Sequence, residues 1–321
     1  MYKHKIYICI YKMSSSSLNT YVDKLNVTVD CKQGAVRNVR FNSDGEYCIS
    51  CGSDKTLKLW NPYRQLHLKT YSGHGYEVLD AHSACDNATL CSGGMDKSVI
   101  LWDVATGQVK RKYRGHAGTV SCVKFNEEST VILSGSVDGT IFCWDCRSRK
   151  SEPIQKLKEA KDSITSLQVS DHEILSGSAD SYIRRYDLRI GRLTCDYVGK
   201  TITCVTFTKD SQCVLASSLD GLLRLFDKQT GELLNEYSGH RNSEYKIDSC
   251  LNNTDNLILS GSEDGIVYIW DLISAETKAK LEHPDQRPVH SLSHHPSDAV
   301  LLTASGSKMY MWTSRYRNTD D

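Results

Sequence analysis

The chain has 321 residues, and its 39 basic and 39 acidic side chains give a formal net charge of zero. A protein built to hold a nucleic acid backbone carries a basic excess, so this balance argues against nucleic acid as a direct ligand. The 13 cysteines are scattered singly, mostly in apolar runs, which is typical of a reducing, intracellular compartment rather than of a disulfide framework.

The chain opens with a segment, residues 1–23, that we expect to be a disordered extension. Its one apolar run, 6–11, is too short for a membrane span or a signal-peptide core, so we expect no membrane contact. Met13, followed by four serines, competes with Met1 as the true start. The first predicted strand is the run 24–29, which has no obvious partner nearby in the sequence.

A repeat then governs the chain. An aromatic residue recurs at steps of 42, 42, 42, 40, 44 and 42 residues, and an aspartate stands six residues before each of the first six. Small residues around that aspartate predict a tight turn between two alternating strands. The aromatic anchors are Trp60, Trp102, Trp144, Tyr186, Phe226, Trp270 and Trp312, and the turn aspartates are Asp54, Asp96, Asp138, Asp180, Asp220 and Asp264.

Each unit is predicted to be a four-stranded antiparallel sheet. One such sheet cannot bury both of its faces, but sheets stacked around an axis can. Seven units over residues 24–313 therefore predict a single all-β domain, a seven-bladed β-propeller, followed by a polar tail, 314–321. That tail is a poor fourth strand for the last unit. We expect the run 24–29 to supply the missing strand and to close the ring.

Three units carry Gly-His before their first strand, and with the period and the turns they make the chain resemble the WD-repeat family throughout. The resemblance implies that each His joins a buried hydrogen-bond chain with Ser, Asp and Trp of its own blade. A structural role explains sets that recur at a fixed offset, so we assign no catalytic triad. The implied sets are His74–Ser92–Asp96–Trp102, His116–Ser134–Asp138–Trp144 and His240–Ser260–Asp264–Trp270.

The other units depart from this pattern. Unit one has Lys32 where His is expected, and units four and five lack the His and carry Tyr186 and Phe226 in place of Trp. Unit seven lacks the turn aspartate, with Ser305-Gly-Ser-Lys308 in its place. We expect these blades to depend more on packing than on a polar network.

The face that carries the Gly-His connections is where propellers of this family commonly bind partners. The two extra residues of unit six fall in 241–246 on that face, either as a partner contact or as a tolerated loop insertion. By register, the channel mouth on this face is predicted to present Arg37, Glu77, Leu79, Thr119, Ser121, Thr165 and Thr203, with Tyr245 and His290 nearby.

Two motifs, Trp144-Asp-Cys-Arg147 and Tyr186-Asp-Leu-Arg189, match the WD-x-Arg signature. In some WD-repeat proteins this signature docks onto the adaptor of a cullin-RING ubiquitin ligase. The alternative is that Arg147 and Arg189 cap the turn and pair with a neighbouring acid.

Several phrases, including 51–62, 71–80 and 125–136, resemble the mitogen-activated protein kinase organizer family of WD-repeat scaffolds. The resemblance is specific because several of these phrases are surface turns. It implies a scaffold for kinases of the extracellular-signal-regulated cascade, in cytoplasm and nucleus. It also implies association with a hypoxia-sensing prolyl hydroxylase and with the spliceosome.

Nothing in the sequence indicates an enzyme. No phosphate-binding loop, nucleophile set or kinase signature lies outside the repeat register. The CxxC pairs, Cys48/Cys51 and Cys143/Cys146, lie in or beside strand-like runs with no second ligand pair, so we expect no metal and no cofactor. We expect a monomeric, non-enzymatic platform for proteins, with a substrate receptor of a ubiquitin ligase as the alternative.

Overall fold

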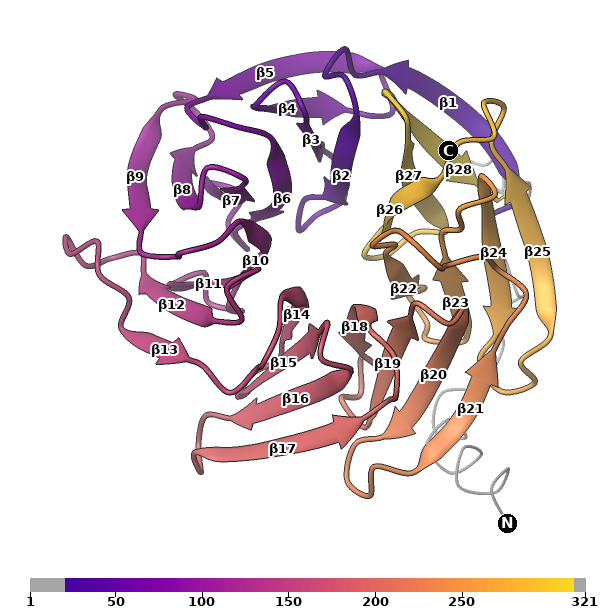
Figure 1. Cartoon of the computed structure of the whole chain (residues 1–321). Helices are drawn as coiled ribbons and strands as arrows, with labels where there is room; N and C mark the ends of the chain where they lie inside the picture. The colour runs from indigo at the N-terminus through magenta and orange to yellow at the C-terminus, as the bar shows by residue number, and fades with distance from the viewer. Residues whose placement is uncertain (1–20, 315–321) are drawn as a thin grey trace.

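The computed structural model describes residues 21–314. It arranges 28 strands in seven antiparallel four-stranded sheets around a central axis, which confirms the predicted seven-bladed propeller (Figure 1). The described residues contain no helix that could span a membrane. Most of the expected extension, 1–23, and of the tail, 314–321, lies outside the described residues.

Within a blade, the first strand in sequence lies at the channel and each following strand lies further outward. Blade 1 contains β2 (Val36–Phe41), β3 (Cys48–Gly52), β4 (Thr56–Asn61) and β5 (Leu66–Ser72); blade 2, β6 (Val78–Ser83), β7 (Thr89–Gly94), β8 (Ser98–Asp103) and β9 (Val109–Arg114); blade 3, β10 (Val120–Phe125), β11 (Val131–Ser136), β12 (Ile141–Asp145) and β13 (Gln155–Leu157); blade 4, β14 (Ile164–Val169), β15 (Glu173–Ser178), β16 (Tyr182–Asp187) and β17 (Arg192–Tyr197).

Blades 5 to 7 repeat the same order, except that the outermost strand of blade 7 comes from the start of the chain. Blade 5 contains β18 (Ile202–Phe207), β19 (Cys213–Ser218), β20 (Leu222–Asp227) and β21 (Leu233–Tyr237); blade 6, β22 (Ser249–Leu251), β23 (Leu257–Ser260), β24 (Ile266–Asp271) and β25 (Thr277–Glu282); blade 7, β26 (Val289–His294), β27 (Val300–Ser305), β28 (Lys308–Thr313) and β1 (Lys24–Asp30).

Strand β1 closes the ring as predicted. It pairs antiparallel with β28, from Lys24 opposite Thr313 to Asp30 opposite Lys308, and it extends one residue beyond the predicted run (Figure 1). Its side chains alternate between the two sides of the strand: Val27 and Val29 are buried against the blade, and Thr28 between them is exposed. The outer edge of β28 is therefore covered by the strand that the polar tail could not supply.

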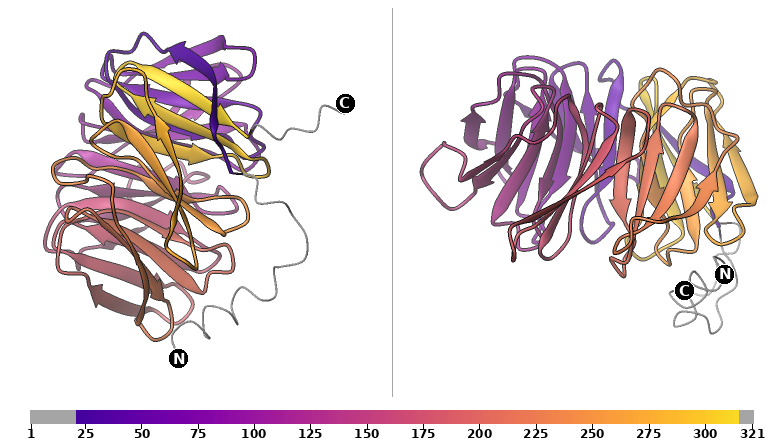
Figure 2. Two further views of the ribbon diagram at one scale, coloured as in Figure 1. Left: turned by 90° about the vertical axis from the view of Figure 1, so that its right-hand side faces the viewer. Right: turned by 60° about the horizontal axis from the view of Figure 1, so that its bottom comes forward.

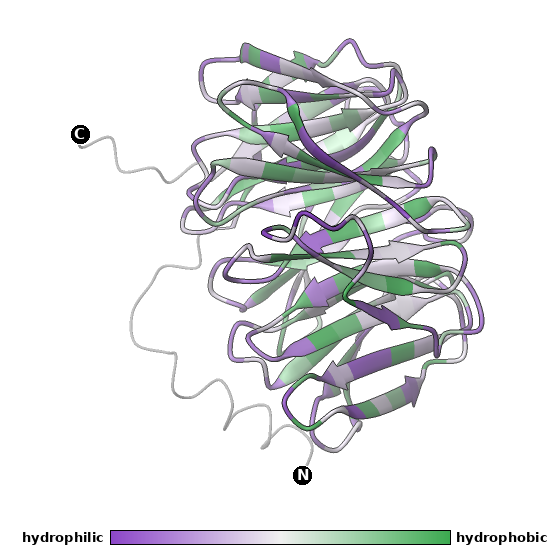
Figure 3. Ribbon diagram, turned by 90° about the vertical axis from the view of Figure 1, so that its left-hand side faces the viewer, coloured by the Kyte–Doolittle hydropathy of each residue, from purple (hydrophilic) through white to green (hydrophobic). Residues whose placement is uncertain are grey.

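The hydrophobic core lies between blades rather than inside any one of them. One cluster joins Val29 of β1 and Met311 of β28 to Val39 of blade 1, and another joins Leu101 of blade 2 to Val123 of blade 3. Apolar residues lie along the strands and hydrophilic ones gather in the connections (Figure 3). The blades stack side by side around the axis, so each covers a face that its neighbour could not bury alone (Figure 2).

The closure predicts a specific loss of stability. Deleting residues 24–30 should sharply lower the unfolding temperature, because it exposes β28 and separates the two ends of the ring. Replacing Val27 and Val29 together with Ala should cost about 2–4 kcal/mol of unfolding free energy in urea titrations.

Thr28→Ala is the matched control. It changes the same strand on its exposed side and should stay within about 0.5 kcal/mol of the parent chain. An unfolding midpoint that survives the deletion unchanged would contradict closure by β1.

Candidate partner-binding face and buried networks

Two of the three implied hydrogen-bond sets form. In blade 2, Trp102 Nε1 donates to Ser92 Oγ at 2.8 Å, and His74 lies 2.7 Å from Ser92 Oγ and 2.9 Å from Asp96 Oδ1. The Asp96 carboxylate can only accept, so the His74 ring donates to it from Nδ1. Ser92 contacts both the indole N–H and His74 Nε2, so one continuous relay links the tryptophan to the turn.

Blade 3 repeats the relay with looser contacts. His116 lies 2.8 Å from Ser134 Oγ and 3.3 Å from Asp138 Oδ2, and Trp144 donates to Ser134 at 2.8 Å. Burial lowers the pKa of His116, which keeps the ring neutral near pH 7. Burial acts to raise the pKa of Asp138, but hydrogen bonds from Thr140 and from the Ala117 N–H outweigh it and lower that pKa to about 2.

The third set, His240–Ser260–Asp264–Trp270, does not form. His240 is buried, yet neither ring nitrogen has a hydrogen-bond partner among the described residues. Trp270 Nε1 donates to the Ser238 carbonyl instead, and the Ser260 hydroxyl donates to the Gly261 carbonyl. Burial lowers the pKa of His240 to about 4.

The enlarged connection of blade 6 explains this departure. His240 precedes its tryptophan by 30 residues, whereas His74 precedes Trp102 by 28. The loop is held by Glu263, whose carboxylate accepts the backbone N–H groups of Ser243 and Glu244 at 2.7 and 2.6 Å. Asp264 instead accepts a hydrogen bond from the Tyr268 hydroxyl at 2.9 Å.

Blades 1 and 7 contain networks that the sequence analysis missed. In blade 1 the central residue is Gln33, not Lys32. The Ser50 hydroxyl donates to the side-chain amide oxygen of Gln33 and accepts the Trp60 indole N–H at 2.8 Å. In blade 7, His283 lies 2.7 Å from Thr303 Oγ1, which accepts the Trp312 N–H at 3.0 Å. Both central residues lie within one residue of the 28-residue offset from their tryptophan, so a tolerant offset search would have found them.

Blades 4 and 5 replace histidine with arginine. Arg184, two residues before Tyr186, binds Asp180 at 2.6 Å, and Arg224, two residues before Phe226, binds Asp220 at 2.7 Å. Each guanidinium also donates to the serine that begins the turn, Ser178 or Ser218. The expectation that these blades depend mainly on packing is therefore wrong, because an ion pair holds each turn.

The predicted channel mouth coincides with a ring of β-bulges. Six of the seven innermost strands are irregular at the same register, and a bulge re-aims the side chain of the extra residue. The six extra residues are Arg37, Leu79, Ser121, Thr165, Thr203 and His290.

The predicted residues around the mouth differ in how far their side chains are exposed. Arg37 bonds Glu77 at 2.9 Å with both side chains accessible, and the ring of Tyr245 meets that of His290 edge-on at 5.4 Å. Leu79, Thr119, Ser121 and Thr165 are half-buried. The side chain of Lys246 crosses the mouth from blade 6 and donates to the Ser121 carbonyl of blade 3 at 3.1 Å.

Thr203 is the exception among the predicted mouth residues. It is buried, and the amide of Asn242 from the enlarged loop of blade 6 donates to its hydroxyl at 3.3 Å. The loop therefore covers this side of the mouth, so Thr203 does not face a partner.

Arg147 and Arg189 lie in the connections that leave the third strand of their blades, at the opposite end of the ring from the bulges. Both side chains are exposed, at 74% and 65%, and they approach Asp145 and Asp187 at 3.5 and 3.6 Å. Each pairs loosely with the acid of its own motif, as the alternative interpretation expects, and each stays accessible to a partner.

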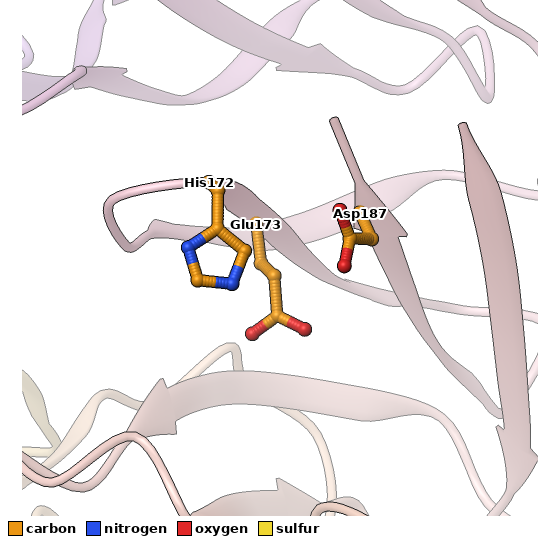
Figure 4. A group of neighbouring side chains, drawn as sticks. All are labelled: His172, Glu173 and Asp187. Atoms are coloured by element: carbon orange, nitrogen blue, oxygen red, sulfur yellow. The ribbon is translucent and has the colours of Figure 1, made fainter. Parts of the chain in front are cut away.

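One side-chain cluster has the composition of a metal site. His172, Glu173 and Asp187 bring one potential ligand atom each to within 4.8 Å of one another at the ends of β15 and β16 (Figure 4). Glu173 is bound by the Lys228 ammonium of blade 5 at 2.7 Å, and the Arg189 guanidinium lies 3.6 Å from Asp187. These cations already compensate the two carboxylates, so the cluster is accounted for as an interblade ion pair.

Comparison with known proteins matches five segments of the chain to the WD domain, G-beta repeat family, at 24–61, 66–103, 107–145, 191–227 and 231–271. The chain is 60% identical over 294 residues to WD repeat domain-containing protein 83 of Homo sapiens, covering 92% of this chain and 93% of that protein. The Danio rerio protein of the same name is 60% identical, covering 89% and 90%. An uncharacterized WD repeat-containing protein of Schizosaccharomyces pombe is 43% identical, covering 84% and 91%.

The two histidines, His74 and His240, permit a matched test of the networks. His74→Leu leaves Ser92 and Asp96 without their partner and should cost about 1–3 kcal/mol in chemical unfolding. His240→Leu removes a buried ring that has no hydrogen bond, so it should cost clearly less. Equal losses in the two variants would show that His240 is bonded in solution after all.

Proposed function

The chain belongs to the WD-repeat family, and on that premise we propose that it is a non-enzymatic scaffold that binds proteins at the bulged mouth of its channel. The observation that carries this proposal is a group of exposed apolar side chains in the connections of that face. They are Tyr76, Met95, Val137 and Tyr245, at 63%, 44%, 50% and 46% exposure.

These side chains are not explained by folding. Met95 and Val137 immediately precede the turn aspartates of blades 2 and 3, where a polar residue would face water at lower cost. Large apolar and aromatic groups that stay exposed within a polar rim are typical of protein-binding surfaces. Lys55 lies 5.7 Å from the ring of Tyr76, which adds a charged group to the same surface.

The partners follow from the resemblance stated above. We propose kinases of the extracellular-signal-regulated cascade as cytoplasmic partners, together with a hypoxia-sensing prolyl hydroxylase. Spliceosomal proteins are the proposed nuclear partners. A rigid ring that holds successive kinases would raise their local concentration for one another without any catalytic group of its own.

Proximity labelling, performed separately in cytoplasm and nucleus, tests this function. We expect kinases among the cytoplasmic partners and splicing factors among the nuclear ones, and Tyr76→Ala with Tyr245→Ala should deplete one or both groups severalfold. Leu66→Ala is the control, because it removes an equally exposed apolar side chain from an outer strand. Labelling of neither group, or equal depletion by the control, would remove the proposal.

A second function, docking onto the adaptor of a cullin-RING ubiquitin ligase, is favoured by one observation: Arg147 and Arg189 are both exposed at the same end of the ring. Replacing both with Ala should abolish recovery of the adaptor in pull-downs, while the fold stays intact because neither side chain is buried. Equal recovery with the parent chain and the variant would eliminate this function.

A further inference from the structure

The end of the channel opposite the bulges opens into a polar cavity of about 360 Å³. The far ends of the innermost strands of blades 1 to 4 and of blade 7 form its wall, with Lys124, His82 and His294 among the lining side chains. None of the motifs considered above reaches this cavity, so its composition needs a separate explanation.

Lys124 is the unusual member of the wall. It occupies the same register position as Arg40 in blade 1 and His82 in blade 2, each 42 residues apart. Arg40 has direct partners, binding Asp248 at 2.8 Å and the Leu292 carbonyl at 2.7 Å. Within residues 21–314, by contrast, no hydrogen bond or ion pair to the Lys124 ammonium is found.

Lys124 is half-buried in the cavity wall, and its surroundings affect the stability of its charge. Burial, and after it the charge of Arg40, lower the pKa of Lys124. The carboxylates of Asp80 and Asp248 act in the opposite direction and raise that pKa. Neither is bonded to Lys124: Asp248 pairs with Arg40, and Asp80 accepts hydrogen bonds from Asn38 and from the Val123 N–H. The one acidic side chain in the wall, Glu127, is exposed. An anion in the cavity would give the Lys124 ammonium the direct partner that it lacks among the described residues.

The two histidines of the wall have fixed tautomers. His82 Nδ1 accepts the Phe125 N–H at 3.3 Å, so the proton of its neutral ring is on Nε2. His294 Nδ1 donates to the His295 carbonyl at 2.8 Å, which leaves Nε2 as an acceptor. Burial lowers the pKa of both rings, that of His294 to about 4, so both are neutral near pH 7.

We propose that this cavity binds a small oxyanion, a phosphate or carboxylate compound, with Lys124 as its counter-charge. The Nε2–H of His82 supplies a neutral donor, and Nε2 of His294 can accept a hydrogen bond from a protonated oxygen such as that of hydrogenphosphate. A cavity needs roughly 10–15 Å³ to hold one water, so about 360 Å³ leaves room for an oxyanion.

The test uses the full chain, with histidines labelled with ¹⁵N, titrated with sodium phosphate and separately with citrate at constant ionic strength. We expect saturable shifts of the His82 and His294 ring signals with at least one of these anions. The anion that saturates identifies the ligand as a phosphate or a carboxylate compound. A response that remains linear with both anions overturns the proposal.

Substitutions of Lys124 then test whether its charge binds the anion. Lys124→Gln should weaken binding at least about tenfold, as expected for a lost charge-assisted hydrogen bond. Lys124→Arg should retain most of the affinity. Lys158→Gln makes the same chemical change at an exposed site away from the cavity and should bind like the parent chain. Each variant's own histidine spectrum reports whether it is folded, and unchanged binding in folded Lys124→Gln also overturns the proposal.

Discussion

The pairing of β1 with β28 is the interaction on which the ring depends, because it joins segments at opposite ends of the chain. Every other blade is built from consecutive strands, so only blade 7 needs a strand from elsewhere. The edges that face the channel meet a related constraint. In blades 1, 3 and 5, a backbone donor of the innermost strand is satisfied by a side chain of the preceding blade: Ser291 accepts from Val39, Asp80 from Val123, and Ser166 from Val205. Closure covers one outer edge, and these contacts pair backbone groups at three inner edges.

The donor that binds the turn aspartate differs from blade to blade. A partly buried carboxylate needs donors, and losing them costs more than any single bond contributes. Histidine supplies them in blades 2 and 3, arginine in blades 4 and 5, and the Tyr268 hydroxyl in blade 6. The arginines and Tyr268 occupy the same position, two residues before the aromatic anchor. Variation at that position therefore compensates for a missing or misplaced histidine.

The sequence predicted the fold and the closing strand, because a regular period reports a repeated backbone that tolerates many substitutions. The networks were harder to predict, since a hydrogen bond depends on position in space and a fixed offset gives that only when connections have equal length. His74 and His116 share one offset and both bond as implied. His240 has two extra residues before its strand and does not. Those same residues bring Asn242 over Thr203, which no register argument on blade 5 alone could reveal.

The two candidate binding sites lie at opposite ends of the channel. Arg40 lies between them, paired with Asp248 at 2.8 Å and 3.9 Å from Asp80, so it connects blade 1 to blades 2 and 6. A buried network of this kind is costly to break once one partner moves, because the others are left charged and unpaired. A protein at the bulged mouth and an oxyanion beside Lys124 therefore do not compete for space. An oxyanion beside Lys124 would stabilise the folded ring by mass action without altering the exposed side chains of the mouth.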